Sequence, residues 1–478
     1  MSRDEPSVPC PLHAVAHYTP DAAAIISSQD TITYDELDGR VSAAAFRLQE
    51  LEPGSRVALH LLKDERYIIL MLAVVRAGHV ACPVSDRHPP RGVAQLLERA
   101  ACAALMSDDD ELLRLAGAGL YRWKPGPLLE ERQRGESADI PLERPATIVF
   151  TSGSTDIPKP ALHTFGNHYY NALGSNANIM LRPGDRWFHS LPLYHVGGIS
   201  ILFRCLLAGA TIALPGHGTP IGDSIAGLGA THVSLVSTQL LRLLREDTKF
   251  AGLKAVLMGG GPVSASLVDE ALSRKLPIHT SYGLTEMASQ VTTTPPGASL
   301  EALRTAGRVL PEREVSISEE GEILVRGATL FAGYVEGKTL DLPLDTDGWF
   351  HTGDLGELDE DGCLRVLGRK DNLFVSGGEN IQPEEIEEVL CRLDGIDEAV
   401  VVPVPDPEFG YRPVAFIKTE GDKPEDLAPK LRAFLPGFKI PTSFHSWPKY
   451  ARRGIKPDRN ALRERAQQMQ DQRRYRSP

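Results

Sequence analysis

The sequence lacks several features that mark particular classes of protein. Its six cysteines are scattered over 478 residues without a Cys-x-x-Cys pair, which argues against a disulfide framework or a zinc site. No apolar run approaches the ~20 residues that span a bilayer. The N-terminus shows no apolar segment behind a basic patch, so no secretory signal is visible. These absences together predict a cytoplasmic protein.

Positive charge is also in deficit, with 51 Lys and Arg against 63 Asp and Glu and a net charge of −12. Such a chain has no general attraction for nucleic acid or an anionic membrane, so any polyanion must be bound locally. The 42% of hydrophobic and 24% of charged residues are typical of a globular protein. The length corresponds to about three domains at ~150 residues each.

Helical and strand-like patterns alternate through most of the chain. Tyr34–Leu51 has helical spacing, Arg56–Leu62 is strand-like, and Ile68–Arg76 is an apolar helix that ends before Gly78. This alternation predicts an α/β fold with βα layered subdomains, in which helices cover mostly parallel sheets. From about Gly307 to Leu367 the pattern changes to short strands separated by Gly and Asp, which predicts a small β-barrel or meander.

A smaller α+β unit is predicted after Gly368-Arg-Lys-Asp371, and a boundary near residue 370 follows. We therefore expect a large N-terminal domain (1–370) and a C-terminal domain (371–478), with a frayed polar tail from Gln467. The predicted elements of the second domain are helices over 383–390 and 428–434 and strands over 399–403 and 414–417.

One segment is suited to holding phosphate. Thr151-Ser-Gly-Ser-Thr-Asp-Ile-Pro-Lys159 follows the apolar strand candidate 146–150, and its glycine and hydroxyl residues allow donors to approach an anion. The order of residues is not that of a Walker loop. Taken alone, the segment is equally well explained as a surface turn.

Further blocks follow in a fixed order, and with this loop they resemble the acyl-adenylate-forming (AMP-binding) superfamily over about residues 30–465. The blocks are Leu191-Pro-Leu-Tyr-His195-Val-Gly-Gly198, Met258-Gly-Gly-Gly-Pro262, Ser281-Tyr-Gly-Leu-Thr-Glu286, His351-Thr-Gly-Asp354, Gly368-Arg-Lys-Asp-Asn372, Ser376-Gly-Gly-Glu-Asn380 and Gly454-Ile-Lys456. The resemblance implies an acid–thiol ligase that uses ATP, Mg²⁺ and CoA.

The resemblance also implies roles for individual residues. Tyr282 would stack on adenine, Thr285 would contact the α-phosphate, and Glu286 would bind Mg²⁺. Lys456 would bridge the acyl carboxylate and the phosphate, Asp371 would be the hinge of a mobile C-terminal lid, and His195 would line the acyl pocket or serve only in packing. The remaining implied positions are Thr151, Ser152, Gly153, Ser154, Thr155, Lys159 and Gly260 for ATP, Asp354 and Arg369 for ribose, and Gly377 and Gly378 for the CoA channel.

Local strings resemble the branch of the family that activates 2-succinylbenzoate for menaquinone biosynthesis. They include the segments 234–244, 371–386 and 454–462. The second carboxylate of that acid needs a cationic or hydrogen-bonding partner, for which Thr238 and Arg242 are candidates, although Arg242 is equally well read as a surface residue. Another aryl- or fatty-acyl-CoA ligase is the alternative.

Asp156 departs from the family pattern, which usually has Gly at that position of the phosphate loop. A carboxylate beside a triphosphate is electrostatically unfavourable, so a degenerate adenylate-binding homologue is a further alternative. The sequence leaves open whether the chain forms a homo-oligomer.

Overall fold

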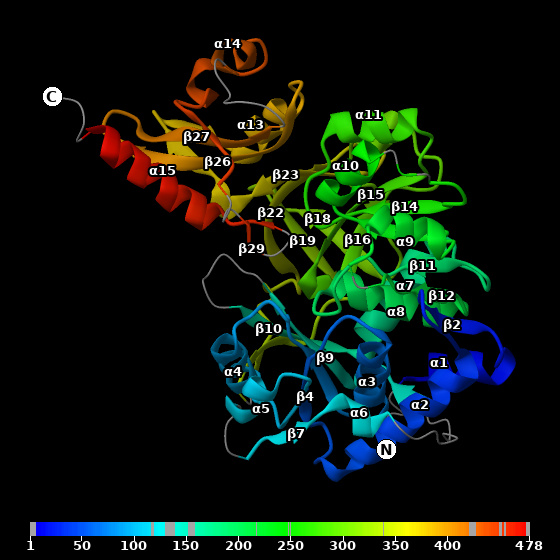
Figure 1. Ribbon diagram of the computed structural model, residues 1–478. Helices are drawn as coiled ribbons and strands as arrows, with labels where there is room; N and C mark the ends of the chain where they lie inside the picture. The colour runs from blue at the N-terminus through cyan, green and yellow to red at the C-terminus, as the bar shows by residue number, and fades with distance from the viewer. Residues whose placement is uncertain are drawn as a thin grey trace.

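The computed structural model describes residues 6–115, 119–129, 139–151, 158–216, 218–246, 248, 250–337, 339–419, 427–448, 452–453 and 456–474 of the chain. A body built on two large sheets carries most of the chain, and a smaller unit lies at its C-terminal end (Figure 1). No helix within these ranges is long and apolar enough to cross a membrane.

The first large sheet is parallel on one side and antiparallel on the other. The neighbouring strands β7, β6, β4, β5 and β9 run parallel, whereas the pairs β9–β10, β10–β20 and β20–β21 are antiparallel. In the described part of the chain its order is β21 (Thr339–Asp341), β20 (Gly333–Glu336), β10 (Lys159–Thr164), β9 (Pro145–Thr151), β5 (Val80–Pro83), β4 (Arg56–His60), β6 (Ala104–Ser107) and β7 (Tyr121–Trp123).

The second large sheet is parallel from β15 to β2 and antiparallel at both edges. The predicted α/β architecture with mostly parallel sheets is therefore confirmed. Among the described residues the strand order is β17 (Arg308–Val309), β16 (Ser289–Thr293), β15 (Ile278–Leu284), β14 (Ala255–Met258), β13 (His232–Leu235), β11 (Arg186–Phe188), β12 (Thr211–Ala213), β2 (Ala23–Ile26) and β3 (Thr31–Thr33).

The helices of the body begin and end at recognisable sequence signals. Thr33 and Glu36 form a capping box at the start of α2, and Gly209 ends α8 in the left-handed conformation. The described helices of the body are α1 (Pro11–Tyr18), α2 (Tyr34–Arg47), α3 (Glu65–Arg76), α4 (Pro90–Arg99), α5 (Asp110–Leu115), α6 (Pro125–Leu128), α7 (Phe165–Asn178), α8 (Val196–Ala208), α9 (Ile221–Gly227), α10 (Ser237–Arg245), α11 (Ala265–Ser273) and α12 (Leu300–Leu303).

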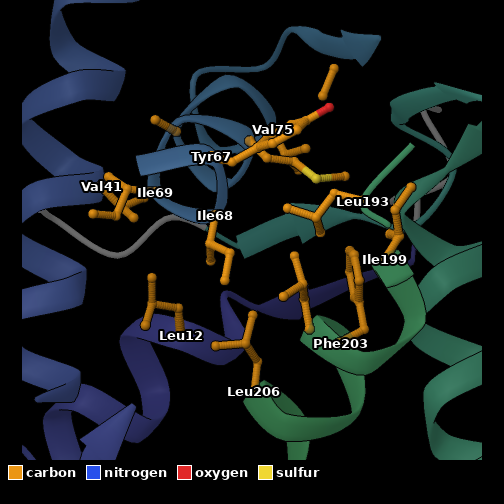
Figure 2. Close-up of a cluster of buried hydrophobic side chains, with 14 of the residues drawn as sticks. Leu12, Val41, Tyr67, Ile68, Ile69, Val75, Leu193, Ile199, Phe203 and Leu206 are labelled. Carbon is orange, nitrogen blue, oxygen red and sulfur yellow. The ribbon is translucent and has the colours of Figure 1, made fainter. Parts of the chain in front are cut away.

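One hydrophobic cluster joins the two large sheets. Figure 2 shows Tyr67 and Ile68 of α3, which flanks the first sheet, near Leu193 and near Ile199 and Phe203 of α8, the helix that connects β11 to β12 of the second sheet. Burial of apolar side chains from both sides makes the two halves one body. The carboxyl ends of their parallel strands are thereby held in a fixed relation.

A four-stranded antiparallel sheet follows where the short strands were predicted. Its order is β18 (Arg313–Ile317), β19 (Glu322–Gly327), β22 (Phe350–Leu358) and β23 (Leu364–Arg369). Backbone hydrogen bonds of Leu364 to Ala306 and Gly307 attach this sheet to the second large sheet. The register places Asp354 directly opposite Arg369.

The C-terminal unit has its own sheet, covered on both faces. One hydrophobic cluster lies under α13 (Pro383–Cys391) and α14 (Leu427–Leu431), and another lies under α15 (Arg459–Arg474). Neither cluster contains a described residue before Phe374, although the boundary at residue 370 stays a prediction. The strands are β25 (Glu379–Ile381), β24 (Phe374–Ser376), β27 (Gly410–Thr419), β26 (Ile396–Asp406) and β28 (Phe444–Ser446), with a separate hairpin of β29 (Arg452–Arg453) and β30 (Lys456–Pro457).

The prediction of a frayed tail from Gln467 is wrong as far as Arg474, because α15 continues to that residue. Leu462 and Ala466 are buried against valines of β26, and this short apolar stripe anchors an otherwise polar helix.

Polar contacts among the described residues join the C-terminal unit to the body. Arg245 of α10 forms a two-point ion pair with Asp397 at the start of β26. The Ser266 hydroxyl donates to the Cys391 carbonyl (3.3 Å), and the Gln382 side-chain amide donates to the Arg369 carbonyl (3.2 Å). These contacts hold the unit over α10, α11 and the end of β23.

Candidate active site

A chain of hydrogen bonds links three sequence blocks that the topology brings together. The Tyr282 hydroxyl donates to Asp354 Oδ2 (2.7 Å), and Arg369 Nη1 donates to Asp354 Oδ1 (3.1 Å). Arg369 also donates to the Thr352 carbonyl (2.9 Å) and pairs with Asp371 (3.0 Å). The Asp354 carboxylate is thus held from two sides by strands β15 and β23.

Burial, and next the Asp354 carboxylate, raises the pKa of Tyr282 well above its usual value of 10. The hydroxyl therefore stays protonated and serves as a donor at neutral pH. Tyr282 is 9% exposed, so only a limited part of its surface is open to a ligand.

A second cluster surrounds Glu286, which lies in the short helix η2 (Thr285–Met287) directly after β15. The Tyr334 hydroxyl of β20 donates to Glu286 Oε1 (2.6 Å), and the Lys159 Nζ lies 5.0 Å from the centre of the Tyr334 ring. Burial, followed by the Glu286 charge, raises the pKa of Tyr334 well above its usual value. Tyr334 therefore contacts both the phosphate-loop lysine and the predicted metal carboxylate.

Hydrogen bonds from neighbouring strands and loops hold the backbone of this cluster at Thr285 and Glu286. His163 of β10 donates from Nε2 to the Thr285 carbonyl (2.7 Å), and the Phe331 amide donates to the Glu286 carbonyl (2.8 Å). The carbonyl partner requires His163 to carry its proton on Nε2. Burial lowers the pKa of His163 to about 4, so the ring is neutral at pH 7.

The phosphate loop is delivered by a hairpin. Strands β9 and β10 pair in antiparallel register, with Thr151 opposite Lys159 at the end that the loop connects. Thr151 is buried and Lys159 is exposed. Ser152, Gly153, Ser154, Thr155 and also Asp156 lie outside the described residues.

Comparisons with known proteins bear on this arrangement. The family model of AMP-binding enzymes matches residues 12–335, and the model of the C-terminal domain of AMP-binding enzymes matches residues 385–452. The chain belongs to the AMP-binding enzyme family.

Several members of this family are similar over nearly the full length. The chain is 33% identical over 457 residues to 2-succinylbenzoate–CoA ligase from Listeria monocytogenes serotype 4b, covering 94% of this chain and 97% of that protein. The structure of o-succinylbenzoate CoA synthetase from Bacillus subtilis with the acyl-adenylate intermediate superposes with a TM-score of 0.87 at 29% identity, over 96% and 98% of the chains. The same enzyme with ATP and magnesium gives 0.86 at 30% identity, over 96% and 100%.

The other predicted site residues in the body of this AMP-binding enzyme lie at the start of α8, on α10 and in the turn after β14. His195 is the N-cap of α8, half-buried, with its ring 4.7 Å from that of Tyr194. Thr238 is half-buried and Arg242 is exposed on α10. Gly260 has a φ of +81° in the turn after β14, a conformation that L side chains rarely adopt.

The predicted residues of the C-terminal unit lie in the β24–β25 turn, in strand β30 and in the connection to the body. Gly377 and Gly378 form the β24–β25 turn with φ of +60° and +87°, and a Cβ on Gly377 would lie 2.9 Å from the Phe409 ring. Lys456 lies in β30 opposite Arg453, and its side chain is outside the description. Asp371 pairs with Arg369 in the connection between the body and the C-terminal unit. The roles predicted for all these residues stay predictions.

Arg204 is a candidate that the motif analysis missed. It is 1% exposed on α8, donates from Nη2 to Gln290 Oε1 (2.5 Å), and lies 5.0 Å from the centre of the Trp187 ring. Its Nε and Nη1 have no hydrogen-bond partner among the described residues. Burial lowers the pKa of Arg204 to about 9, which leaves it a cation at neutral pH. A single charge within the apolar run 201–207 was the sequence signal.

A second buried arginine, Arg313, differs from Arg204 because it donates hydrogen bonds to several backbone carbonyls. Arg313 of β18 donates to the carbonyls of Pro311 (2.9 Å), Tyr170 (3.3 Å), Asn171 (3.4 Å) and Gln290. Gly174 of α7 makes room for it, because a Cβ there would lie 2.3 Å from Arg313 Nη2. Arg313 therefore has a structural role, because its donors are hydrogen-bonded to backbone carbonyls. Arg204, by contrast, has Nε and Nη1 without a partner among the described residues.

Proposed function

We propose that this chain is an AMP-forming 2-succinylbenzoate–CoA ligase. One carboxylate of the acid attacks the α-phosphorus of ATP, so that an acyl-adenylate forms and pyrophosphate leaves. The thiol of CoA then attacks the acyl carbonyl, a thioester forms, and AMP leaves. The near full-length similarity to ligases of that name supports the reaction, and the product belongs to menaquinone biosynthesis.

The Tyr282–Asp354–Arg369 chain supports a nucleoside site. In the proposal, the Asp354 oxygens accept from the ribose hydroxyls, and Arg369 and Tyr282 fix the position of that carboxylate. The Tyr282 ring faces the adenine. Because the protein already orders these groups, little further ordering is needed when ATP binds.

Glu286 suits a magnesium ion carried by ATP. Its Oε1 is held by Tyr334, while its Oε2 has no hydrogen-bond partner in the described part of the chain. One carboxylate oxygen together with phosphate oxygens and water is the usual environment of Mg²⁺. The ion neutralises charge on the phosphates, while Thr151, Lys159 and Thr285 position the α- and β-phosphates from the protein side.

The observation that carries the choice of acid is the buried Arg204 cation with unused donors. An acid with a second carboxylate supplies the missing counter-charge, whereas a fatty acid would leave it unpaired. Thr238 and Arg242, the sequence-derived candidates, lie on α10, where Thr238 is half-buried and Arg242 is exposed.

The C-terminal unit supplies the rest of the proposed cycle. Lys456 bridges the acyl carboxylate and phosphate during adenylation, and Asp371 is the hinge of a mobile lid over residues 371–478. His195, which belongs to the body, lines the acyl pocket. Gly377 and Gly378 then border the pantetheine channel. A cytoplasmic location is part of the proposal, because ATP and CoA are cytoplasmic co-substrates; a homo-oligomer stays a prediction.

Incubation of the protein with ATP, Mg²⁺, CoA and 2-succinylbenzoate should yield AMP and a thioester in equal amounts. Turnover of a benzoate or a medium-chain acid instead would contradict the choice of acid. If no acid is turned over, D156G tests the degenerate alternative, since a large gain of activity on removal of that carboxylate would identify a decayed phosphate loop.

A further inference from the structure

The interface between the C-terminal unit and the body is polar in the part of the chain that the structure describes. Each hydrophobic cluster of described residues lies wholly within the body or wholly within the C-terminal unit. Two units without a shared apolar cluster are held in one orientation by individual polar contacts, each of which can be broken alone.

Helix α13 of the C-terminal unit is attached to the body at both ends. At its start, the Gln382 side-chain amide donates to the Arg369 carbonyl (3.2 Å). At its end, the Ser266 hydroxyl of α11 donates to the Cys391 carbonyl (3.3 Å). Both are hydrogen bonds between neutral groups, whereas the next attachment along the chain joins two full charges.

This attachment is the ion pair between the end of α10 and the start of β26. Arg245 Nη1 donates to Asp397 Oδ2 (2.9 Å), and Nη2 donates to Oδ1, so the two planar groups meet side by side. Asp397 lies where the register of β26 shifts between Ile396 and Glu398, and such a bulge redirects a side chain. Arg245 is the last residue of α10, where the helix dipole favours a cation.

The two partners of this ion pair differ in their access to solvent. The side chain of Asp397 is 5% exposed, and that of Arg245 is 40% exposed. Among the described residues Arg245 is the cationic partner of Asp397. Loss of the arginine charge would leave a buried carboxylate unpaired, and that cost is relieved when the unit turns away and the carboxylate reaches water.

The strand that carries Lys456 is tied to the same helix. Arg459, three residues further on at the start of α15, donates from Nη1 and Nη2 to the two carboxylate oxygens of Glu387 on α13 (2.6 and 2.7 Å). Figure 1 shows the neighbouring strand β29 on the side of the unit that is turned toward the body. The contacts that hold α13 on the body therefore also set where the backbone of β30 lies.

We propose that Arg245 and Asp397 are positioning residues for adenylation, because their ion pair holds the C-terminal unit in the orientation seen here and acts through Lys456. The inference rests on the proposed function, in which Lys456 takes part in adenylation and the lid moves before CoA reacts. Neither residue belongs to the proposed substrate site. The pair sets the balance between the two half-reactions, since a weaker pair lowers the population of this orientation.

The test measures each half-reaction in a single turnover. Pyrophosphate release from ATP, Mg²⁺ and 2-succinylbenzoate reports adenylation, and the reaction of preformed acyl-adenylate with CoA reports thioester formation. The readout is the ratio of the first rate constant to the second. Because Arg245 is partly exposed, we expect R245Q to lower this ratio roughly 3- to 30-fold. D397N should lower it by less, since the arginine that it leaves unpaired reaches water.

Restoring the charges should restore the ratio. The double variant R245D/D397R re-forms the pair with reversed polarity, and R245K keeps the positive charge, so both should have ratios nearer the wild type than R245Q. R304Q is the matched control, because it breaks an exposed ion pair with Asp269 (3.4 Å) inside the body and should leave the ratio unchanged. If R245Q leaves the ratio unchanged, whether both half-reactions slow equally or neither does, the inference is overturned. Should the double variant not fold, as judged by its thermal unfolding, R245K decides, and a ratio as low as that of R245Q overturns the inference.

Small-angle X-ray scattering of the full chain separates this inference from the proposed function, because it needs no turnover. We expect R245Q to scatter differently from the wild type, and R304Q to scatter like it. If the wild type forms no acyl-adenylate from 2-succinylbenzoate while R245Q changes the scattering, the proposed acid is wrong and the hold of the pair on the unit stands. If the wild type forms the adenylate and R245Q changes neither the scattering nor the ratio, only the role of the pair fails.

Discussion

At the proposed nucleotide side of the site, Asp354 and Arg369 are paired with each other and with further protein groups, whereas at the proposed acyl side Arg204 has no carboxylate partner in the described chain. The first arrangement is complete before any ligand arrives. The second is complete only when a ligand brings a negative charge.

The difference shows how one site could bind ATP in the same way in every cycle and still select among acids. In the proposed function, the prepaired groups hold their geometry whatever acid is present and bind ATP in the same way in every reaction cycle. An unpaired buried cation lowers the stability of the free protein, and it discriminates against each acid that cannot supply its counter-charge.

The largest expected effect comes from Lys456, which the proposal places between the two sides. We expect K456A to slow adenylation by roughly 10²–10³, because one preorganised charge at the reacting phosphate is lost. Thioester formation from preformed acyl-adenylate and CoA should be largely spared. Single-turnover measurements of the two half-reactions separate these effects, and an equal loss in both would show that the assigned role is wrong.

The two sides also differed in how far the sequence could predict them. Tyr282, Thr285 and Glu286 are neighbours in one block, and the apolar strand before Thr151 predicted where the phosphate loop is delivered. Local patterns of this kind follow from residues that are close in sequence, so they could be recognised without coordinates.

The parts of the site that the sequence did not predict are contacts between distant segments. Arg204 and Gln290 are separated by 86 positions, and Glu286 and Tyr334 by 48. Their meeting depends on sheet order and register, which periodicity does not specify. The prediction of a frayed tail failed for a related reason, because the short apolar stripe of α15 is buried only by its contact with β26.

The next largest effect is expected from D354N, which should weaken the binding of ATP alone. D354N keeps the size of the side chain but loses its charge, and its amide donor competes with the donors of Tyr282 and Arg369. We expect the Kd for Mg·ATP to rise about 10- to 100-fold, since bonds to a charged group are lost. Isothermal titration measures the change.

The control for D354N is the preference for 2-succinylbenzoate over a medium-chain acid, measured as the ratio of their kcat/KM values, which should stay as in the wild type. A variant that also lost this preference would show that the two sides are not separable.

A smaller effect is expected from Y334F, which removes the hydroxyl that holds Glu286 and keeps the ring beside Lys159. Loss of one hydrogen bond of about 0.5–1.5 kcal/mol corresponds to a rise of roughly 2- to 10-fold in the Mg²⁺ concentration that gives half-maximal ATP binding. Fluorescence or calorimetric titration of ATP at graded Mg²⁺ checks this. An unchanged Mg²⁺ dependence would mean that Tyr334 does not position the carboxylate.

The smallest effect on activity is expected from H163Q, because glutamine also offers a donor to the Thr285 carbonyl. Its signature lies in stability. His163 has a pKa of about 4 in the folded chain and about 6.5 when unfolded. Between these values the unfolded chain binds more protons, so the free energy of unfolding falls as the pH is lowered from 6.5 toward 4. H163Q removes up to about 1.4 kcal/mol per pH unit of that slope.

Urea midpoints at pH 7, 6 and 5 report this slope, with H351Q as the matched control. The Glu322 carboxylate, and also Asp345, raises the pKa of His351 against the opposing effect of desolvation. That histidine therefore stabilises the fold at low pH, and the contribution is lost as the pH rises through its folded pKa. Replacing it should change the pH dependence with the opposite sign. Parallel curves for H163Q and the wild type would instead show that His163 is not the neutral, buried donor beneath Thr285 from which the nucleotide side derives its fixed geometry.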